Sequence, residues 1–253
     1  MATSSMMTPW REYPGTRART SILLLPGGER PLDSLTDEPA QPDLLGRLDD
    51  ELRSHRAVPM DLRTPVAAIG SNAAPEVVRT KLLAAGLTPI VPMVCGRLHN
   101  LRISLSAHVS LPGFVPAAPA WVAGDVAQVV VGWFDAEQLA RIDITEPNYD
   151  RIWLPARDHR LDLPGWPDLG GVDGAGAGVD VYRSKRGVLA GPDGPWHLRP
   201  QPELSATFAK LGIEPWVTKS PLDAARALAG SGELRAQARR EFRRLNLVRL
   251  AWG

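Results

Sequence analysis

The stretch Val66-Ala67-Ala68-Ile69-Gly70-Ser71-Asn72 decides how the chain is interpreted, because an apolar run stops there at a small polar turn. The run predicts a buried strand. The residues that follow, from Pro75 to Ala85, carry apolar side chains at helical spacing. Glycine permits backbone angles that other residues avoid, and the first amides of a helix have no partner inside it. A strand that ends in Gly-Ser-Asn is therefore a candidate cradle for a carboxylate or a developing oxyanion.

A second strand and helix of the same kind follow downstream, at Val129 to Phe134 and Asp135 to Asp143. Asn72 is the predicted cap of the first helix, and Asp135 with Gln138 predicts a capping box for the second. The second helix runs into Thr145-Glu146-Pro147-Asn148-Tyr149, so its end delivers Glu146. An amide cradle and one carboxylate form a plausible catalytic pair.

These two motifs resemble, in order along the chain, those of the γ-glutamylcyclotransferase family. The first reads Ala68-Ile69-Gly70-Ser71-Asn72 and the second Ile142-Asp143-Ile144-Thr145-Glu146-Pro147-Asn148-Tyr149. Residues 96–103 and 113–117 resemble the family's middle strands, so the resemblance covers roughly residues 65–183. Ile69 replaces the family's aromatic residue, and Pro147 replaces its glycine.

The resemblance implies a mixed α/β (α+β) fold with a compact β-barrel-like core, flanking helices and long terminal extensions. We expect residues 1–64 to form an N-terminal extension packed on the core, residues 65–186 the core, and residues 187–253 a helical extension. In the first extension, residues 22–25 predict a buried strand. Residues 42–53 predict an amphipathic helix through the leucines at positions 44, 45, 48 and 52.

The same resemblance implies a function. Glu146 is the expected catalytic acid and base, and the expected substrate-binding residues are Ile69, Gly70, Ser71, Asn72 and Tyr149. Ser71 is not an expected nucleophile, because the Gly-x-Ser-x-Gly elbow is absent. The expected reaction releases 5-oxoproline from a γ-glutamyl amine or similar amide, with no cofactor. Two alternatives stay open: a related acyl-transfer or amide-hydrolysing tailoring enzyme, and a noncatalytic binder of an acidic small molecule.

Composition agrees with an ordinary globular protein. Of 253 residues, 44% are hydrophobic and 23% charged, with a net charge of +1, so nothing global indicates nucleic acid or a membrane as a partner. The single Cys95 excludes an internal disulfide and suits the cytoplasm, and its apolar surroundings favour a buried side chain over a nucleophile. The arginines of the last predicted helix, at 232–247, are interrupted by glutamates and favour a solvent-facing or partner-facing surface. The sequence leaves the oligomeric state open.

Other polar features point to structure rather than to chemistry. The five histidines lack the i, i+4 spacing of a helical metal pair, so no metal site is expected. His108 is interpreted as a hydrogen-bonded histidine at a strand end. Leu101, Ile103 and Leu105 alternate with polar residues, which predicts a strand with one wet face. The glycine-rich residues 169–178 are expected to form a surface loop, because they lack the spacing of a dinucleotide-binding turn.

Overall fold

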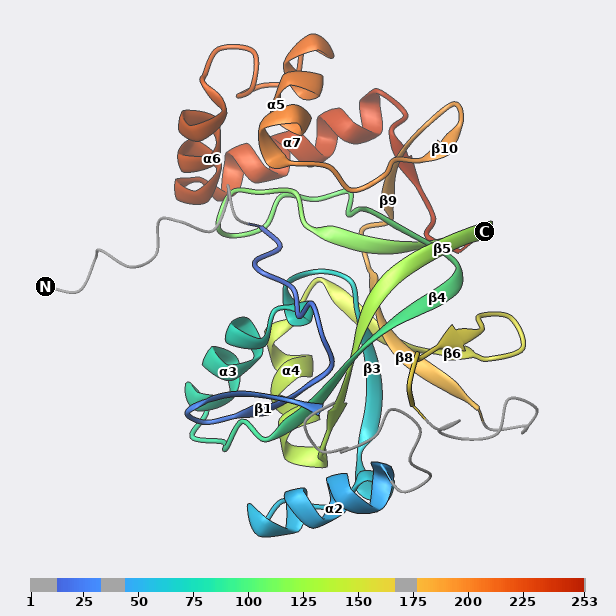
Figure 1. Ribbon diagram of the computed structural model, residues 1–253. Coiled ribbons are helices and arrows are strands. Elements are labelled where there is room, and N and C mark those ends of the chain that lie inside the picture. The colour runs from blue at the N-terminus through green and yellow to red at the C-terminus, as the bar shows by residue number, and fades with distance from the viewer. Residues whose placement is uncertain (1–12, 33–43, 167–176, 253) are drawn as a thin grey trace, which may run out of the picture. The chain divides into compact units, whose positions relative to one another are not determined.

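A computed structural model describes residues 13–32, 44–166 and 177–252 (Figure 1). The chain forms two compact units that interleave along the sequence. Residues 16–101 and 122–182 belong to one, here called the sheet unit, and residues 1–15, 102–121 and 183–253 to the other, the helical unit. The three consecutive segments suggested by the sequence stay a prediction. The glycine-rich loop at 169–178 lies almost wholly outside the described residues.

Among the described residues the main sheet has eight strands, ordered β2-β1-β4-β5-β3-β8-β6, with β7 paired to β4. Strand β3 lies antiparallel to β5 and parallel to β8. The expected mixed α/β fold is confirmed, and the order of the described strands is that of an open sheet. The strands are β1 Ile22–Leu25, β2 Gly28–Pro31, β3 Thr64–Ala68, β4 Val91–Leu105, β5 Ala117–Phe134, β6 Tyr149–Pro155, β7 Leu161–Asp162 and β8 Gly178–Ser184.

Most of the expected strands occur where the sequence placed them. Residues 22–25 form β1, which pairs with β4 with Ile22 opposite Met93. The segment at 113–117 is an exception, because only Ala117 belongs to a strand. Gly113 has a φ of +88°, and its amide donates a 3.0 Å hydrogen bond to the carbonyl of Ser110. A tight turn therefore occupies the positions where a strand was expected.

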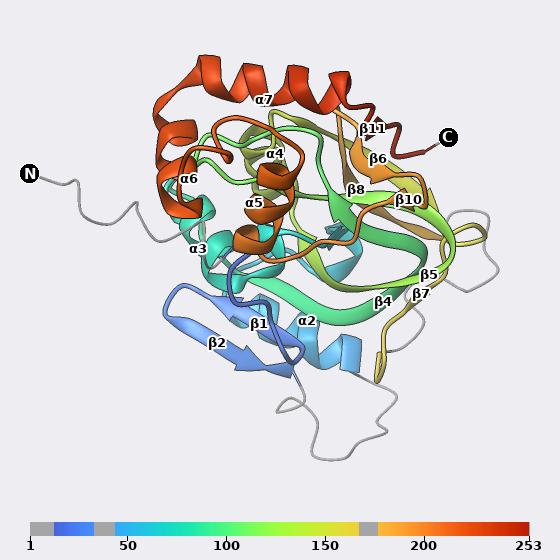
Figure 2. The same cartoon turned by 90° about the horizontal axis from the view of Figure 1, so that it is seen from above.

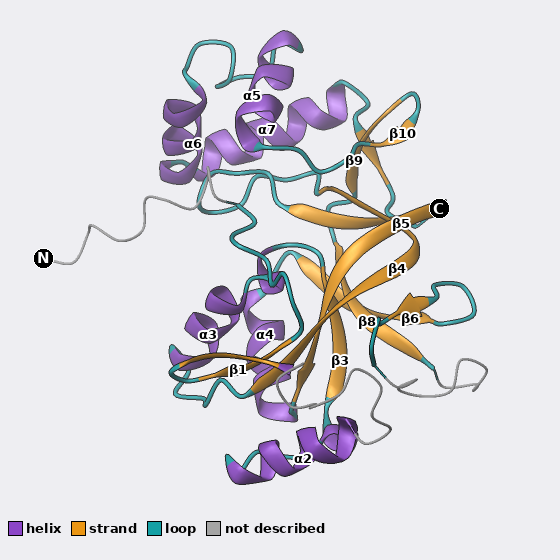
Figure 3. Cartoon of the chain, viewed as in Figure 1, coloured by secondary structure: helices purple, strands orange, loops and turns teal. Residues whose placement is uncertain are grey.

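The described residues of the sheet unit include the α-helices α2 Leu44–Ser54, α3 Pro75–Leu83 and α4 Ala136–Thr145 (Figure 3). The predicted capping box is confirmed, because the Asp135 side chain accepts from the Gln138 amide at 2.9 Å and the reciprocal bond is also present. Helices α3 and α4 pack side by side against the sheet (Figure 1). Their shared apolar core includes Val66, Val78, Leu82, Val130, Leu139 and Ile142.

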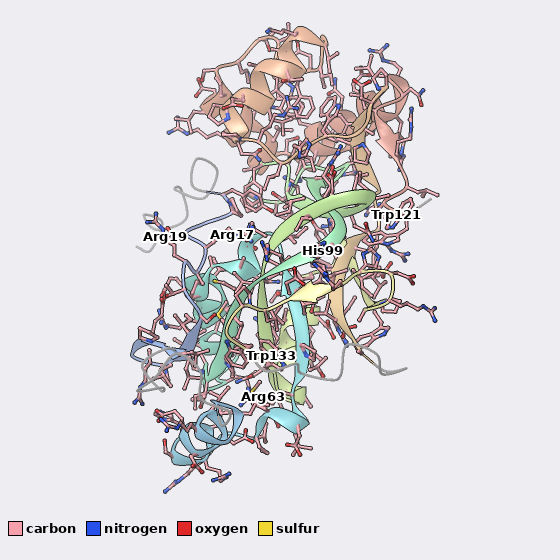
Figure 4. The ribbon with its side chains drawn as sticks, turned by 45° about the vertical axis from the view of Figure 1, so that its right-hand side comes forward. Arg17, Arg19, Arg63, His99, Trp121 and Trp133 are labelled. Atoms are coloured by element: carbon pink, nitrogen blue, oxygen red, sulfur yellow. The ribbon has the colours of Figure 1, made fainter. Side chains whose placement is uncertain are left out.

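Arg63 is a buried cross-link between strands of this unit. Its guanidinium donates to the carbonyls of Ile90, at 3.1 Å, and Trp133, at 3.0 Å. The side chain lies beside the Trp133 strand end, and the residue is only 6% exposed (Figure 4). Burial lowers the pKa of Arg63, and the negative charges of Asp135 and Asp49 partly offset that effect. These charge-assisted bonds fix the start of β3, the element that carries the candidate turn.

The helical unit has its own core. It contains α5 Gln201–Lys210, α6 Pro221–Gly230 and α7 Gly232–Arg244, together with a small sheet of β9 Val188–Gly191, β10 Gly194–Pro195 and β11 Val248–Arg249 (Figure 2). The ring of Phe208 lies 4.5 Å from that of Trp216 and 5.0 Å from that of Phe242, centroid to centroid. Leu247 is buried in the same cluster, so the segment that follows α7 is docked in this unit.

The end of β4 differs from the predicted wet face. Ser104 and Ser106 are both fully buried. The Ser106 hydroxyl lies 2.6 Å from Nδ1 of His108 and 2.6 Å from the Ser184 hydroxyl. The prediction of a wet face is wrong at these positions: Ser106 satisfies its polarity inside the protein, and the Ser104 hydroxyl is buried with no hydrogen-bond partner among the described residues. The interpretation of His108 as a hydrogen-bonded histidine at a strand end is confirmed.

His108 should make folding sensitive to acid. Burial and the positive charges of Arg186 and Arg239 lower its pKa from 6.5 to about 4. Below pH 6.5 the unfolded chain therefore binds a proton before the folded chain does, and the free energy of unfolding falls until about pH 4. The full loss is up to about 3 kcal/mol. Denaturant unfolding at stepped pH should show this slope, and His108→Gln should flatten it. The exposed His55→Gln is the control, and an unchanged slope in His108→Gln would assign the acid sensitivity elsewhere.

Candidate functional site

The turn after β3 is a short 3-10 helix at Ser71–Ala73, labelled η3. The Ala73 amide donates to the carbonyl of Gly70 at 3.0 Å. Within the described part of the chain, the N–H groups of residues 70–72 donate to no backbone carbonyl, as expected where a helix begins. Gly70 has a φ of −107°. The turn therefore does not use the positive φ that glycine readily adopts.

Asn72 does not cap the following helix, so that prediction is wrong. The N-cap of α3 is Ala74, whose side chain makes no capping bond, and Pro75 takes the first helical position. The Asn72 side chain instead donates from Nδ2 to Oε1 of Glu146 at 3.1 Å. A contact between residues 74 positions apart thus replaces the local cap.

Glu146 stands at the C-terminal end of α4. It is the C-cap residue, and its amide donates to the carbonyl of Asp143 at 3.1 Å. The capping box fixes where this helix begins, and packing against α3 fixes its direction. Because η3 directly precedes α3 in the chain, the packing of α4 against α3 brings the C-terminal end of α4 close to η3.

Lys81 is the residue of this site that the sequence did not indicate. Its ammonium lies 2.8 Å from Oε1 of Glu146 and 2.7 Å from Oδ1 of Asn72. The Lys81 and Glu146 side chains are 19% and 16% exposed, so both are largely shielded but reachable from solvent. Lys81 lies in α3 next to Leu82, a buried position, and resembles an ordinary solvent-facing lysine in the sequence. Only the fold shows that it faces Glu146.

The remaining predicted binding residues lie along the same two motifs. Ile69 directly follows β3 and is 7% exposed. Tyr149 begins β6, is half-buried, and donates from its amide to the carbonyl of Glu146 at 2.9 Å. The structure therefore brings Asn72 into direct contact with Glu146 and places Tyr149 in the turn that follows Glu146. The roles of these residues toward a substrate stay predictions.

A second charged network borders this site. It is centred on Asp143, which lies in α4 about one helical turn before Glu146. Arg151 donates from Nε to Asp143 at 3.0 Å and from Nη1 to Asp180 at 2.5 Å, and Tyr182 donates to Asp143 at 2.6 Å. Burial, the bond to Asp143 and the negative charge of Glu146 raise the pKa of Tyr182. The hydrogen bond to Asp143 is the largest cause that raises the pKa of Arg151. The network keeps Tyr182 protonated and pairs two carboxylates with one guanidinium beside the end of α4.

Other candidate residues behave as structural groups. Burial raises the pKa of Cys95, outweighing the opposing charge of Arg17, so the thiol lacks the character of a nucleophile. Among the residues that the structure describes, no group of three His, Cys, Asp or Glu side chains is placed to hold a metal ion. No helix in those same residues has the length and apolarity to cross a membrane.

Comparisons with known proteins give a likeness of fold. No protein-family model and no curated protein matches the chain. A structure named gamma-glutamyl cyclotransferase is 13% identical over 70% of this chain and 99% of that one, with a TM-score of 0.39. A solution structure of an Arabidopsis thaliana protein is 16% identical over 60% and 87%, with a TM-score of 0.37. A crystal structure of a Homo sapiens protein is 14% identical over 70% and 98%, with a TM-score of 0.40.

One of these structures has the name of the family that the two sequence motifs resemble. Identities and TM-scores this low carry no information about the reaction. A functional proposal has to rest on the residues of the site themselves.

Proposed function

We propose that this protein is a γ-glutamylcyclotransferase-like enzyme that releases 5-oxoproline from a γ-glutamyl amine or peptide. The observation that carries the proposal is the 3.1 Å contact between the Asn72 side chain and the Glu146 carboxylate. It joins the Gly-Ser-Asn turn, whose amides donate to no backbone carbonyl of the described chain, to a largely shielded carboxylate. A carbonyl-binding element and a proton acceptor within reach of one small substrate are what an acyl transfer requires.

The substrate supplies both reacting groups. A γ-glutamyl amide carries a nucleophile, its α-amine, and an electrophile, its γ-carbonyl carbon, so the site has only to hold them in a ring-closing pose. Such positioning is worth several kcal/mol of the barrier. The side chains of Ile69 and Tyr149 are proposed to contact the substrate and hold it in this pose.

Glu146 moves the proton. Its carboxylate takes a proton from the substrate ammonium, and the freed amine forms a bond to the γ-carbonyl carbon. The amides of Gly70, Ser71 and Asn72 stabilise the oxyanion that develops. Glu146 then returns the proton to the leaving nitrogen as the original amide bond breaks. The attacking nitrogen loses its second proton to the departing amine. The products are therefore 5-oxoproline and an ammonium, and atoms and charge balance.

The test is an incubation of the purified protein with a panel of γ-glutamyl amines and peptides, with 5-oxoproline measured by mass spectrometry. Matched α-glutamyl isomers are the controls, because they have the same mass and charge but present no γ-amide. The expected result is 5-oxoproline from at least one γ-glutamyl compound and from no α-isomer. Absence of product across a broad panel would contradict the proposal.

A second candidate is a noncatalytic binder of an acidic small molecule. The ion pair between Lys81 and Glu146 favours it, because that contact occupies the carboxylate. The Lys81 ammonium also lies 2.7 Å from Oδ1 of Asn72, in the turn whose backbone N–H groups donate to no carbonyl of the described chain. Saturable binding of a γ-glutamyl compound without 5-oxoproline release would support this alternative.

A further inference from the structure

We propose that Lys81 recognises the substrate carboxylate and that this recognition frees Glu146 to accept a proton. The inference rests on the proposed function and names the substrate feature that the site requires. It begins from the 2.8 Å ion pair between the Lys81 ammonium and the oxygen of Glu146 that Asn72 also contacts. A carboxylate oxygen held in this way accepts a substrate proton only after the contact has opened.

A free α-amino acid head group is the chemical complement of this ion pair. It carries an ammonium and a carboxylate on one carbon, so it can exchange partners with the protein without changing the total charge. The substrate carboxylate pairs with Lys81, and the substrate ammonium pairs with Glu146. The exchange replaces one largely shielded ion pair by two, and it avoids leaving either protein charge unpaired, which is costly in a shielded site.

The exchange also delivers the reacting group. The ammonium that has to lose a proton arrives at the carboxylate that takes it, so binding and activation become one event. A compound with a masked carboxylate leaves Lys81 on Glu146, and a compound with a masked amine offers Glu146 no cation. The proposed substrates are therefore γ-glutamyl compounds whose α-amine and α-carboxylate are both free.

No other cation in the described residues takes this role. Arg151 is held by Asp143 and Asp180. Arg141 of α4 donates to the backbone carbonyl of Lys81, at 3.4 Å. Lys81 has three donor hydrogens, and its two contacts leave one available for an incoming oxygen.

The experiment measures binding by titration calorimetry with L-glutamate, which has the free head group but no leaving amine. L-glutamic acid α-amide lacks the α-carboxylate, and N-acetyl-L-glutamate lacks the ammonium. Wild type is compared with Lys81→Met, which keeps the aliphatic stem, and with Lys81→Arg, which keeps the charge. Arg141→Met removes a neighbouring positive charge that does not touch Glu146, and is the control variant.

Lys81→Met should weaken L-glutamate binding at least tenfold. It should not weaken binding of the α-amide, whose ammonium then meets Glu146 without a competing lysine. Lys81→Arg should recover part of the loss, and Arg141→Met should bind as wild type. Glu146→Gln should bind N-acetyl-L-glutamate several-fold more tightly than wild type, because Lys81 no longer has a competing carboxylate. Equal losses for L-glutamate and its α-amide in Lys81→Met, or no loss at all, would overturn the proposal.

These measurements stand apart from turnover. If the binding pattern holds and no compound releases 5-oxoproline, the reaction is wrong but Lys81 is still the carboxylate-binding residue. If 5-oxoproline is released and the binding pattern fails, the reaction stands and the role of Lys81 is wrong. Melting temperatures of the variants exclude a loss of folding as the cause of weaker binding.

Discussion

Replacing Glu146 by glutamine should reduce kcat at least about 10²-fold on any substrate that the wild-type protein converts. Glutamine preserves the size of the side chain and still accepts a hydrogen bond from Asn72, but it cannot take the ammonium proton. The measurement is the initial rate of 5-oxoproline formation at saturating substrate.

The matched control is Glu137→Gln, an exposed carboxylate in the first turn of the same helix, which should keep the native rate. Glu146→Gln should stay folded, because the exchange leaves Asn72 and Lys81 with an amide oxygen to contact. Native turnover by folded Glu146→Gln would remove Glu146 from the mechanism and return attention to the binder alternative.

Local signals in the sequence identified the elements that hold the site. Asp135 and Gln138 predicted the start of α4 correctly, because both partners of a capping box lie within one helical turn. The run before Gly70 predicted β3, and the spacing of Val78 and Leu82 predicted the buried face of α3. In each case the sequence pattern that predicts the element lies within the element itself.

Contacts between distant segments were the part that the sequence could not supply. Asn72 has the side chain of a good helix cap, and nothing near it in the chain indicates that Glu146 takes its amide instead. Lys81 resembles any solvated helix lysine until α3 and α4 are packed together. Ser104 and Ser106 fit a wet strand face by alternation, yet both are buried. Alternation gives the face of a strand but not what covers that face.

The N-terminal segment should prove essential to the fold, and its removal is the second large effect that we expect. Deletion of residues 1–60 removes β1, which pairs with β4, and the helix α2, whose Leu48 and Leu52 are fully buried. Loss of β1 uncovers the apolar side chains of Val91 and Met93 and leaves a strand edge without a partner, which promotes aggregation. We expect an insoluble protein or a fall of many degrees in melting temperature.

A truncated chain can become insoluble or unstable for several reasons. A point variant in β1 therefore tests the packing of this strand on its own. Leu24 in β1 is fully buried and belongs to the core of the sheet unit, whereas its cross-strand neighbour Glu29 is exposed. Leu24→Ala should lower the free energy of unfolding by about 2–5 kcal/mol, from lost burial and the cavity that remains. Glu29→Ala, on the same strand pair, should change it by less than about 0.5 kcal/mol. Denaturant unfolding checks both. A truncated protein as stable as the full chain, together with a neutral Leu24→Ala, would show that β1 is dispensable and that β4 keeps its conformation without it.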